Sequence, residues 1–199
     1  MTADRLKRTF LAVELPYQVK QVVLQLQTTV EAKPKVVKWM KAANIHLTLR
    51  FIGATPEEEI PKINAALAEV VKGYRDIKLR VKGTGVFPKP QRPRILWLGI
   101  EGSVDPLRDL VTGINRALDE MGYPAEKRQY TPHITIARIN YPQRVTPDVT
   151  AFLNCEYEPI DLSVENVKFF QSDLVPGGPI YTLLGVYHLT PEATNAKDQ

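Results

Sequence analysis

The sequence predicts an α+β fold with two lobes, in which antiparallel sheets line a central groove and helices lie outside. Three observations predict it: strands and helices alternate along the 199 residues, the order strand, helix, strand occurs twice, and the last strand of each unit carries the pattern His-x-Thr-x. His46 and His133 are 87 positions apart, while Arg8 and Arg94 are 86 apart. We therefore predict one domain over 1–190 that contains pseudo-repeats at about 8–86 and 94–170, packed face to face around a pseudo-twofold axis.

The elements of the first unit follow from apolar periodicity and from helix-breaking residues. Thr55 is predicted to cap a helix, because Pro56 then takes the first helical position and acidic residues fill the first turn. Gly73 is expected to end that helix. The elements before it are predicted as a strand, a helix, a short strand and a strand at 8–15, 16–31, 36–40 and 45–52.

The second unit and the rest of the chain show the same alternation of patterns. The predicted strands are 77–86, 95–101, 133–138, 160–170 and 180–189. The predicted helices are 103–121 and a short one at 147–154. Residues 191–199 are polar, and we expect a disordered tail there.

Composition and charge are those of an ordinary globular protein with a mild preference for anionic partners. Hydrophobic residues make up 44% and charged residues 24%, and the net charge of +4 gives a pI of about 9.1. The basic residues are spread widely, so the preference for nucleic acid is weak. One concentration, Lys89, Arg92 and Arg94 in a proline-rich stretch, fits a solvated loop and a phosphate-contacting loop equally well.

The apolar runs and the cysteine content of the sequence predict the cellular compartment. No apolar run approaches the ~20 residues that a membrane span needs. The polar start and the short apolar stretch at 10–15 do not resemble a signal peptide. Cys155 is the single cysteine. We expect a cytoplasmic protein without a membrane partner, and we expect a monomer.

The two His-x-Thr-x motifs are the strongest functional feature. Alternate residues of a strand face the same way, so His46 faces with Thr48, and His133 faces with Thr135. One such motif is explained by any amphipathic strand, but two at matching places in a chain with three histidines favour a shared site. The opposite, buried faces are expected to hold Leu47, Leu49 and Phe51 in one strand, and Ile134 and Ile136 in the other.

The residue types favour acid–base chemistry on a phosphodiester. A zinc site lacks Cys or acidic ligands at suitable spacing, and Cys155 lies in no recognisable nucleophile motif. Imidazole has a reference pKa of ~6.5, so one histidine can accept a proton from water while the other donates to the leaving oxygen. The threonine hydroxyls can donate to the phosphoryl oxygens. We therefore expect neither metal nor cofactor.

These segments resemble the 2H phosphoesterase superfamily, and within it the RNA 2′,3′-cyclic phosphodiesterases, also called 2′-5′ RNA ligases. The resemblance covers about residues 8 to 189. The segments that carry it are 8–13 (RTFLAV), 39–53 (WMKAANIHLTLRFIG), 94–99 (RILWLG), 130–138 (YTPHITIAR), 170–172 (FQS) and 178–181 (GPIY).

The resemblance implies hydrolysis of 2′,3′-cyclic phosphate at RNA ends or in cyclic nucleotides, which gives a 2′-phosphate, with 2′-5′ joining as the reverse chemistry. It implies that His46 is the proton donor, that His133 is the proton acceptor, and that Thr48 and Thr135 hold the phosphate. It also implies that Arg138 contacts phosphate or nucleotide. Strand alternation points Arg138 away from His133, so this role requires a bulge or the end of the strand.

Two alternatives stay open at this point. A non-catalytic nucleotide- or RNA-binding module of the same fold would bind RNA without hydrolysis. The same fold could also act on another substrate, such as 2′-5′ oligoadenylate. Product analysis with a 2′,3′-cyclic nucleotide distinguishes these from the leading hypothesis.

Overall fold

The computed structural model describes residues 5–32, 36–141 and 146–191. Most of the predicted disordered tail, 192–199, lies outside the described residues. No helix within the described ranges is long and apolar enough to cross a membrane.

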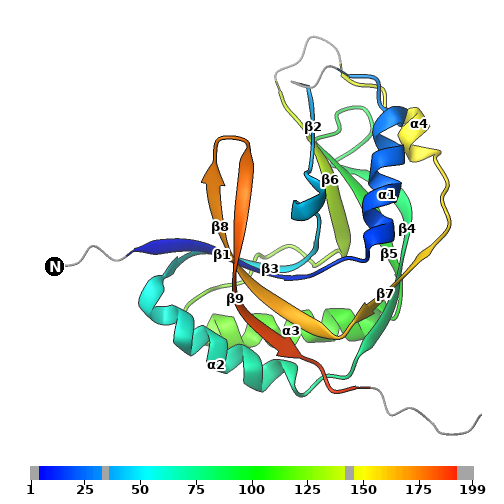
Figure 1. Cartoon of the computed structure of the whole chain (residues 1–199). Helices are drawn as coiled ribbons and strands as arrows, with labels where there is room; N and C mark the ends of the chain where they lie inside the picture. Colours follow the sequence, from blue (N-terminus) through cyan, green and yellow to red (C-terminus); the bar gives the residue numbers. More distant parts are fainter. Residues whose placement is uncertain (1–4, 33–35, 142–145, 192–199) are drawn as a thin grey trace, which may run out of the picture.

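One sheet has four antiparallel strands, and its order explains how distant segments meet. The chain places its first strand in the middle, next to the strand of the first motif. In Figure 1 this sheet crosses the centre of the molecule, and its β8–β9 hairpin projects beyond the body. Its strands, in spatial order, are β3 (Leu47–Pro56), β1 (Leu6–Val13), β8 (Asn166–Val175) and β9 (Gly178–His188).

The second sheet has five antiparallel strands and carries the second motif next to its edge strand. Short β2 forms that edge, so the motif strand β6 lies between β2 and β5. The strands, in spatial order, are β2 (Val37–Trp39), β6 (His133–Ile139), β5 (Ile95–Gly102), β4 (Ile77–Phe87) and β7 (Ile160–Val164).

The helices cover the outer faces of the two sheets. Figure 1 shows α2 and α3 below the four-stranded sheet, and α1 and α4 beside the five-stranded sheet. The helix α3 follows β5 of the five-stranded sheet, and it packs both against β4 of that sheet and against β3 of the other one. The predicted α+β class with two antiparallel sheets is confirmed. The bounds are α1 (Tyr17–Leu26), α2 (Ile60–Val71), α3 (Val104–Glu120) and α4 (Thr150–Leu153).

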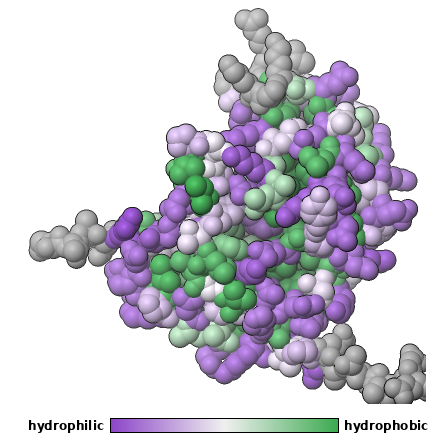
Figure 2. All heavy atoms as spheres, viewed as in Figure 1, coloured by the Kyte–Doolittle hydropathy of each residue, from purple (hydrophilic) through white to green (hydrophobic). Residues whose placement is uncertain are grey.

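A continuous apolar core joins the two sheets and their helices. Its fully buried members include Leu11 and Leu47 from one sheet, Leu98 and Ile134 from the other, and Leu107 from α3. Some apolar side chains stay outside it, and Figure 2 shows such side chains on the surface over the β8–β9 hairpin. The exposed ones there include Leu174, Ile180 and Leu183.

The predicted cap at Thr55 is wrong. Thr55 lies inside β3, is fully buried, and shares a 2.7 Å hydrogen bond between its Oγ1 and that of Thr9 on β1. Pairing with β1 continues to Pro56, so the strand extends through the residues that were predicted to start the helix. A 3₁₀ turn at Glu57–Glu59 takes the acidic residues, and α2 begins only at Ile60.

The predicted strand at 160–170 is two strands that break at Glu165. β7 belongs to the five-stranded sheet and β8 to the four-stranded sheet, so the chain crosses between sheets at this residue. The Glu165 carbonyl accepts a 2.9 Å hydrogen bond from the Leu189 amide, which holds the crossing in place. The helix predicted to residue 31 also ends early, at Leu26, and continues as a 3₁₀ turn over Gln27–Thr29.

Candidate active site

The second motif lies at the start of β6, with the alternation that the sequence predicts. Ile134 and Ile136 are fully buried, while His133 and Thr135 line a cavity on the opposite face. The His133 Nδ1 is 2.7 Å from the Thr131 carbonyl oxygen. Because a carbonyl only accepts, Nδ1 carries the proton in this bond, and Nε2 is left as the reactive nitrogen.

A β-bulge at Ile136 resolves the orientation of Arg138. Leu96 of β5 pairs with Ala137, and the next residue pairs with Thr135, so Ile136 is the extra residue. A bulge reverses the alternation of faces along the strand. Ala137 is therefore buried like Ile136, and Arg138 is exposed and lines the same cavity as Thr135.

The first motif has the same histidine hydrogen bond and the same β-bulge at equivalent positions. His46 directly precedes β3, and its Nδ1 donates to the Asn44 carbonyl at 2.9 Å. Leu11 of β1 pairs with Arg50 and the next residue pairs with Thr48, so a bulge lies at Leu49. The two bulges, at Leu49 and Ile136, are 87 positions apart, as the two histidines are.

The bulge at Leu49 makes one predicted orientation wrong. Phe51 was expected on the buried face, but it is 45% exposed and lines the cavity. Arg50 takes a buried place, 6% exposed, and its Nη2 donates to the Tyr123 carbonyl at 2.8 Å. Phe51 thus holds the position in the first motif that Arg138 holds in the second.

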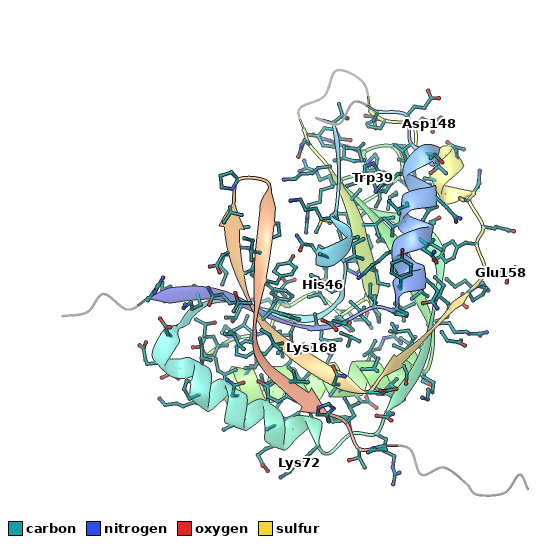
Figure 3. The ribbon with its side chains drawn as sticks, in the orientation of Figure 1. Trp39, His46, Lys72, Asp148, Glu158 and Lys168 are labelled. Atoms are coloured by element: carbon teal, nitrogen blue, oxygen red, sulfur yellow. The ribbon has the colours of Figure 1, made fainter. Side chains whose placement is uncertain are left out.

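Aromatic rings enclose His46. The Phe10 ring stacks on the imidazole at 4.9 Å between centroids, and the Tyr181 ring meets it edge-on at 5.4 Å. Burial among these rings lowers the pKa of His46 to about 4, because the charged imidazolium loses its hydration. His46 is therefore neutral at pH 7 in the free protein. Figure 3 shows it at the centre of the molecule.

His133 lies in a more open aromatic setting. The Phe87 ring meets its imidazole edge-on at 5.0 Å, and the Trp97 indole lies 6.4 Å away. Trp97 in turn lies directly over Gly85, where a Cβ atom would collide with the indole. Glycine at position 85 therefore leaves room for the indole, which meets the His133 imidazole edge-on.

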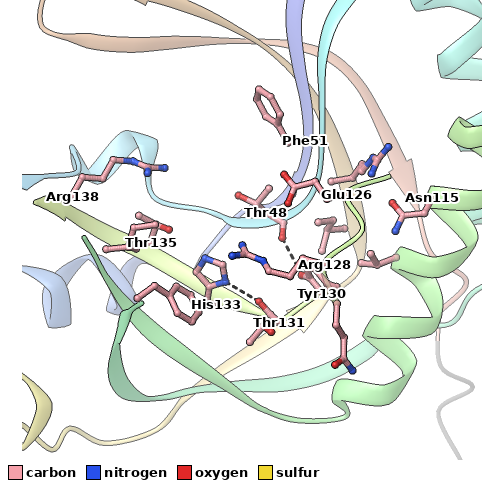
Figure 4. Close-up of a pocket in the computed structure, with 16 residues that line it drawn as sticks. Thr48, Phe51, Asn115, Glu126, Arg128, Tyr130, Thr131, His133, Thr135 and Arg138 are labelled. Atoms are coloured by element: carbon pink, nitrogen blue, oxygen red, sulfur yellow. Dashed lines mark hydrogen bonds between the residues drawn. The ribbon is translucent and has the colours of Figure 1, made fainter. Parts of the chain in front are cut away.

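The cavity between the two motif strands has a volume of about 540 Å³. Figure 4 shows β6 side chains on one side, β3 side chains on another, and the segment leading into β6 closing it. Tyr130 of that segment donates through its Oη to the Thr48 carbonyl at 3.0 Å, which ties the two motifs together. The lining residues include Thr48, Phe51, Arg128, His133, Thr135 and Arg138.

The structure thus brings four of the five predicted site residues into one cavity. Thr48, His133, Thr135 and Arg138 line it, whereas His46, two residues before Thr48, is not among the lining residues. The roles of Phe51 and Arg50 were missed, since a bulge has no reliable sequence signal. No three His, Cys, Asp or Glu side chains within the described ranges gather as a metal-binding group would.

Comparison with known proteins identifies the family. Residues 18–175 match the model of the 2′-5′ RNA ligase superfamily, and the chain belongs to that superfamily. A protein of Methanothermobacter thermautotrophicus named RNA 2′,3′-cyclic phosphodiesterase is 32% identical, over 92% of this chain and 98% of its own. A protein of that name from Thermotoga maritima is 33% identical, over 89% of this chain and 92% of its own.

Solved structures agree with the fold. A crystal structure of a Thermus thermophilus protein superposes with a TM-score of 0.76 at 30% identity, and covers 93% of this chain and 99% of its own. Escherichia coli LigT complexed with 3′-AMP gives a TM-score of 0.75 at 21% identity, over 94% of this chain and 99% of its own. At that identity the second likeness shows the fold alone.

Proposed function

We propose that this protein is an RNA 2′,3′-cyclic phosphodiesterase that opens a cyclic phosphate to a 2′-phosphate. The observation that carries the proposal is the pair of His-x-Thr-x strands, with the same Nδ1 anchoring and the same bulge, on one cavity. The names of the M. thermautotrophicus and T. maritima relatives support the substrate class. A nucleotide bound in the LigT structure supports a nucleotide-sized site in this fold.

The proposed step is an in-line displacement in which the two histidines exchange protons with opposite sides of phosphorus. His133 accepts a proton from water through Nε2 while the water oxygen bonds to phosphorus. The bond from phosphorus to O3′ breaks, and protonated His46 donates its Nε2 proton to O3′. Water is consumed, and the product is a 2′-phosphate with a free 3′-hydroxyl. The family resemblance supports this division of roles.

Because its pKa is low, His46 can act as the proton donor only if substrate binding raises that pKa. With a pKa of about 4, only about one molecule in a thousand carries the proton at pH 7. Raising this pKa to 7 takes about 4 kcal/mol. A unit negative charge ~4 Å away supplies about 4 kcal/mol at an effective dielectric constant near 20. A phosphodiester anion bound at that distance would therefore be sufficient to keep His46 protonated in the complex.

Three other side chains are proposed to hold the phosphate. Thr48 and Thr135 face the cavity from the two motif strands, so their hydroxyls can donate to non-bridging oxygens on which charge grows. Arg138 reaches the same space because of the Ile136 bulge, and its guanidinium suits phosphate geometry. With a 5′-hydroxyl in place of water, the same step would join RNA ends through a 2′-5′ bond.

The test uses a 2′,3′-cyclic nucleotide with EDTA present and separates the 2′- and 3′-phosphate products. We expect the 2′-phosphate alone, and losses in kcat of about 10²–10⁴-fold for His46→Asn and for His133→Asn. His188→Asn is the matched control, because His188 is exposed at the end of β9. Binding without turnover would favour the non-catalytic module, and a 3′-phosphate product would reverse the leaving-group assignment.

The single cysteine, Cys155, supports the cytoplasmic location that the sequence predicts. The expected monomer stays a prediction.

A further inference from the structure

Five exposed basic residues lie on neighbouring segments at one end of the five-stranded sheet, on β2, on β6 and in the 88–94 loop, and we call them the basic edge. Lys38 on β2 lies directly opposite Arg138 on β6 in the sheet register, so both side chains project from the same face. Arg138 is also opposite Ile95, the residue that follows Arg94. All members are exposed: Lys38, Lys89, Arg92, Arg94 and Arg138.

The charges of the basic edge are uncompensated within the part of the chain that the structure describes. Like charges directly opposite each other on adjacent strands are destabilising, and Lys38 and Arg138 are such a pair. No described carboxylate forms an ion pair with any of the five, although cations elsewhere on the surface do have carboxylate partners. An anionic ligand would offset the repulsion.

The two arginines of the loop are held in place without losing their hydrogen-bonding capacity. The guanidinium groups of Arg92 and Arg94 lie 5.3 and 5.4 Å from the centroid of the Tyr141 ring. Such cation–π contacts orient a guanidinium but leave its N–H edge free for phosphate. The Arg94 amide donates to the Phe87 carbonyl at 2.6 Å, which closes the loop against the end of β4.

The basic edge is continuous with the candidate active site. Arg138 belongs to both, since it lines the cavity next to Thr135. Phe87, from which the loop departs, contacts the imidazole of His133. A chain whose end sits at His133 would therefore pass over Arg138 as it leaves the cavity on this side.

We propose that the basic edge binds the backbone phosphates of the RNA chain on the 5′ side of its cyclic end. This rests on the proposed function, because a 2′,3′-cyclic phosphate ends the chain and leaves every other phosphate on its 5′ side. The enzyme therefore prefers a single-stranded RNA oligonucleotide over a cyclic mononucleotide. The preference is electrostatic, so it weakens as salt rises.

The experiment compares kcat/KM for an RNA octamer ending in 2′,3′-cyclic phosphate with kcat/KM for a 2′,3′-cyclic mononucleotide. The first variant is Arg92→Gln with Arg94→Gln. The matched control is Lys72→Gln with Arg75→Gln, which removes the same charge at the end of α2, away from β2 (Figures 1 and 3). Each lost phosphate contact lowers the salt slope by about 0.7 for a single strand.

For two lost contacts, the slope of log(kcat/KM) against log salt for the octamer becomes shallower by about 1.4. At 0.1 M salt this lowers kcat/KM of the variant for the octamer roughly 25-fold relative to the wild type, if the two proteins are compared with their ratio at 1 M salt. The octamer-to-mononucleotide ratio falls accordingly, and the control keeps the wild-type ratio. Because the arginines also pack on Tyr141, a second variant, Lys38→Gln with Lys89→Gln, removes two lysines for which the described chain shows no side-chain partner.

The outcomes separate this inference from the proposed function. If neither substrate is turned over by the wild-type protein, the proposed function fails. If the mononucleotide is turned over but both variants keep the wild-type ratio and salt slope, the basic edge does not bind RNA. An equal loss in the control variant would show that only net charge matters, and would also overturn the assignment.

Discussion

The burial of His46 makes a quantitative prediction about stability and pH. The folded protein holds this pKa at about 4, whereas an unfolded chain has the ordinary value near 6.5. As pH falls, the unfolded state therefore takes up the proton first. The stabilisation is fully present above pH 6.5 and is lost between pH 6.5 and 4.

The magnitude follows from the two pKa values. Between pH 7 and pH 5 the contribution of this group to the free energy of unfolding falls by about 2 kcal/mol, and the total loss below pH 4 approaches about 3 kcal/mol. His46→Asn removes the titration, while its amide can still donate to the Asn44 carbonyl, as Nδ1 does. The variant should lose about 2 kcal/mol less than the wild type over this range.

The measurement is urea denaturation at pH 7 and pH 5, followed by tryptophan fluorescence and extrapolated linearly. His188→Asn, on the exposed end of β9, is the matched control and should lose as much as the wild type. If His46→Asn and the wild type lose the same free energy between the two pH values, the reasoning from burial is refuted.

Three further predictions follow from individual contacts. In the His133→Asn background, calorimetry in two buffers should show uptake of about half a proton when a 2′,3′-cyclic nucleotide binds at pH 7, because a His46 pKa raised from about 4 to 7 leaves half of the molecules protonated. Adding His46→Asn should abolish this uptake, and no uptake at all would make His46 the base. Tyr130→Phe should lower the unfolding free energy by about 1–2 kcal/mol in urea denaturation, because the Thr48 carbonyl loses its donor. Gly85→Ala should cost about 1–3 kcal/mol by the same assay, since its Cβ overlaps the Trp97 ring, and unchanged stability would contradict this placement.

The sequence was sufficient where alternation alone decides orientation. His133, Thr135 and the two buried isoleucines of β6 lie as the period of two requires. Alternation failed at Phe51 because one extra residue at Leu49 reverses the faces, and that residue is an ordinary apolar one. A second bulge, at Ile136, turns Arg138 toward the cavity, so the same kind of irregularity explains both orientations.

Local signals also lose to sheet pairing elsewhere. Thr55 and Pro56 form a sound helix start by themselves, yet they are the last two residues of β3, which pairs with β1 to its end and buries the threonine against Thr9. Pairing adds backbone hydrogen bonds and a buried side-chain contact, and a single helix cap contributes only about 1 kcal/mol. Because the pairing partner is distant in the sequence, the residues around Thr55 alone do not predict this pairing.

The two motifs have the same backbone features, and the side chains around them make them different. Both histidines donate Nδ1 to the carbonyl two residues earlier, and both strands bulge three residues after the histidine. Phe10 and Tyr181 bury the first imidazole, whereas the second lines the cavity.

Acid–base catalysis needs two groups with different proton affinities. Two histidines in identical surroundings would have equal proton affinities. Unequal burial breaks that symmetry at the imidazoles, and the pair Phe51 and Arg138 breaks it again two residues after each bulge. At these equivalent positions the cavity is therefore lined by an aromatic ring from the first motif strand and by a guanidinium from the second.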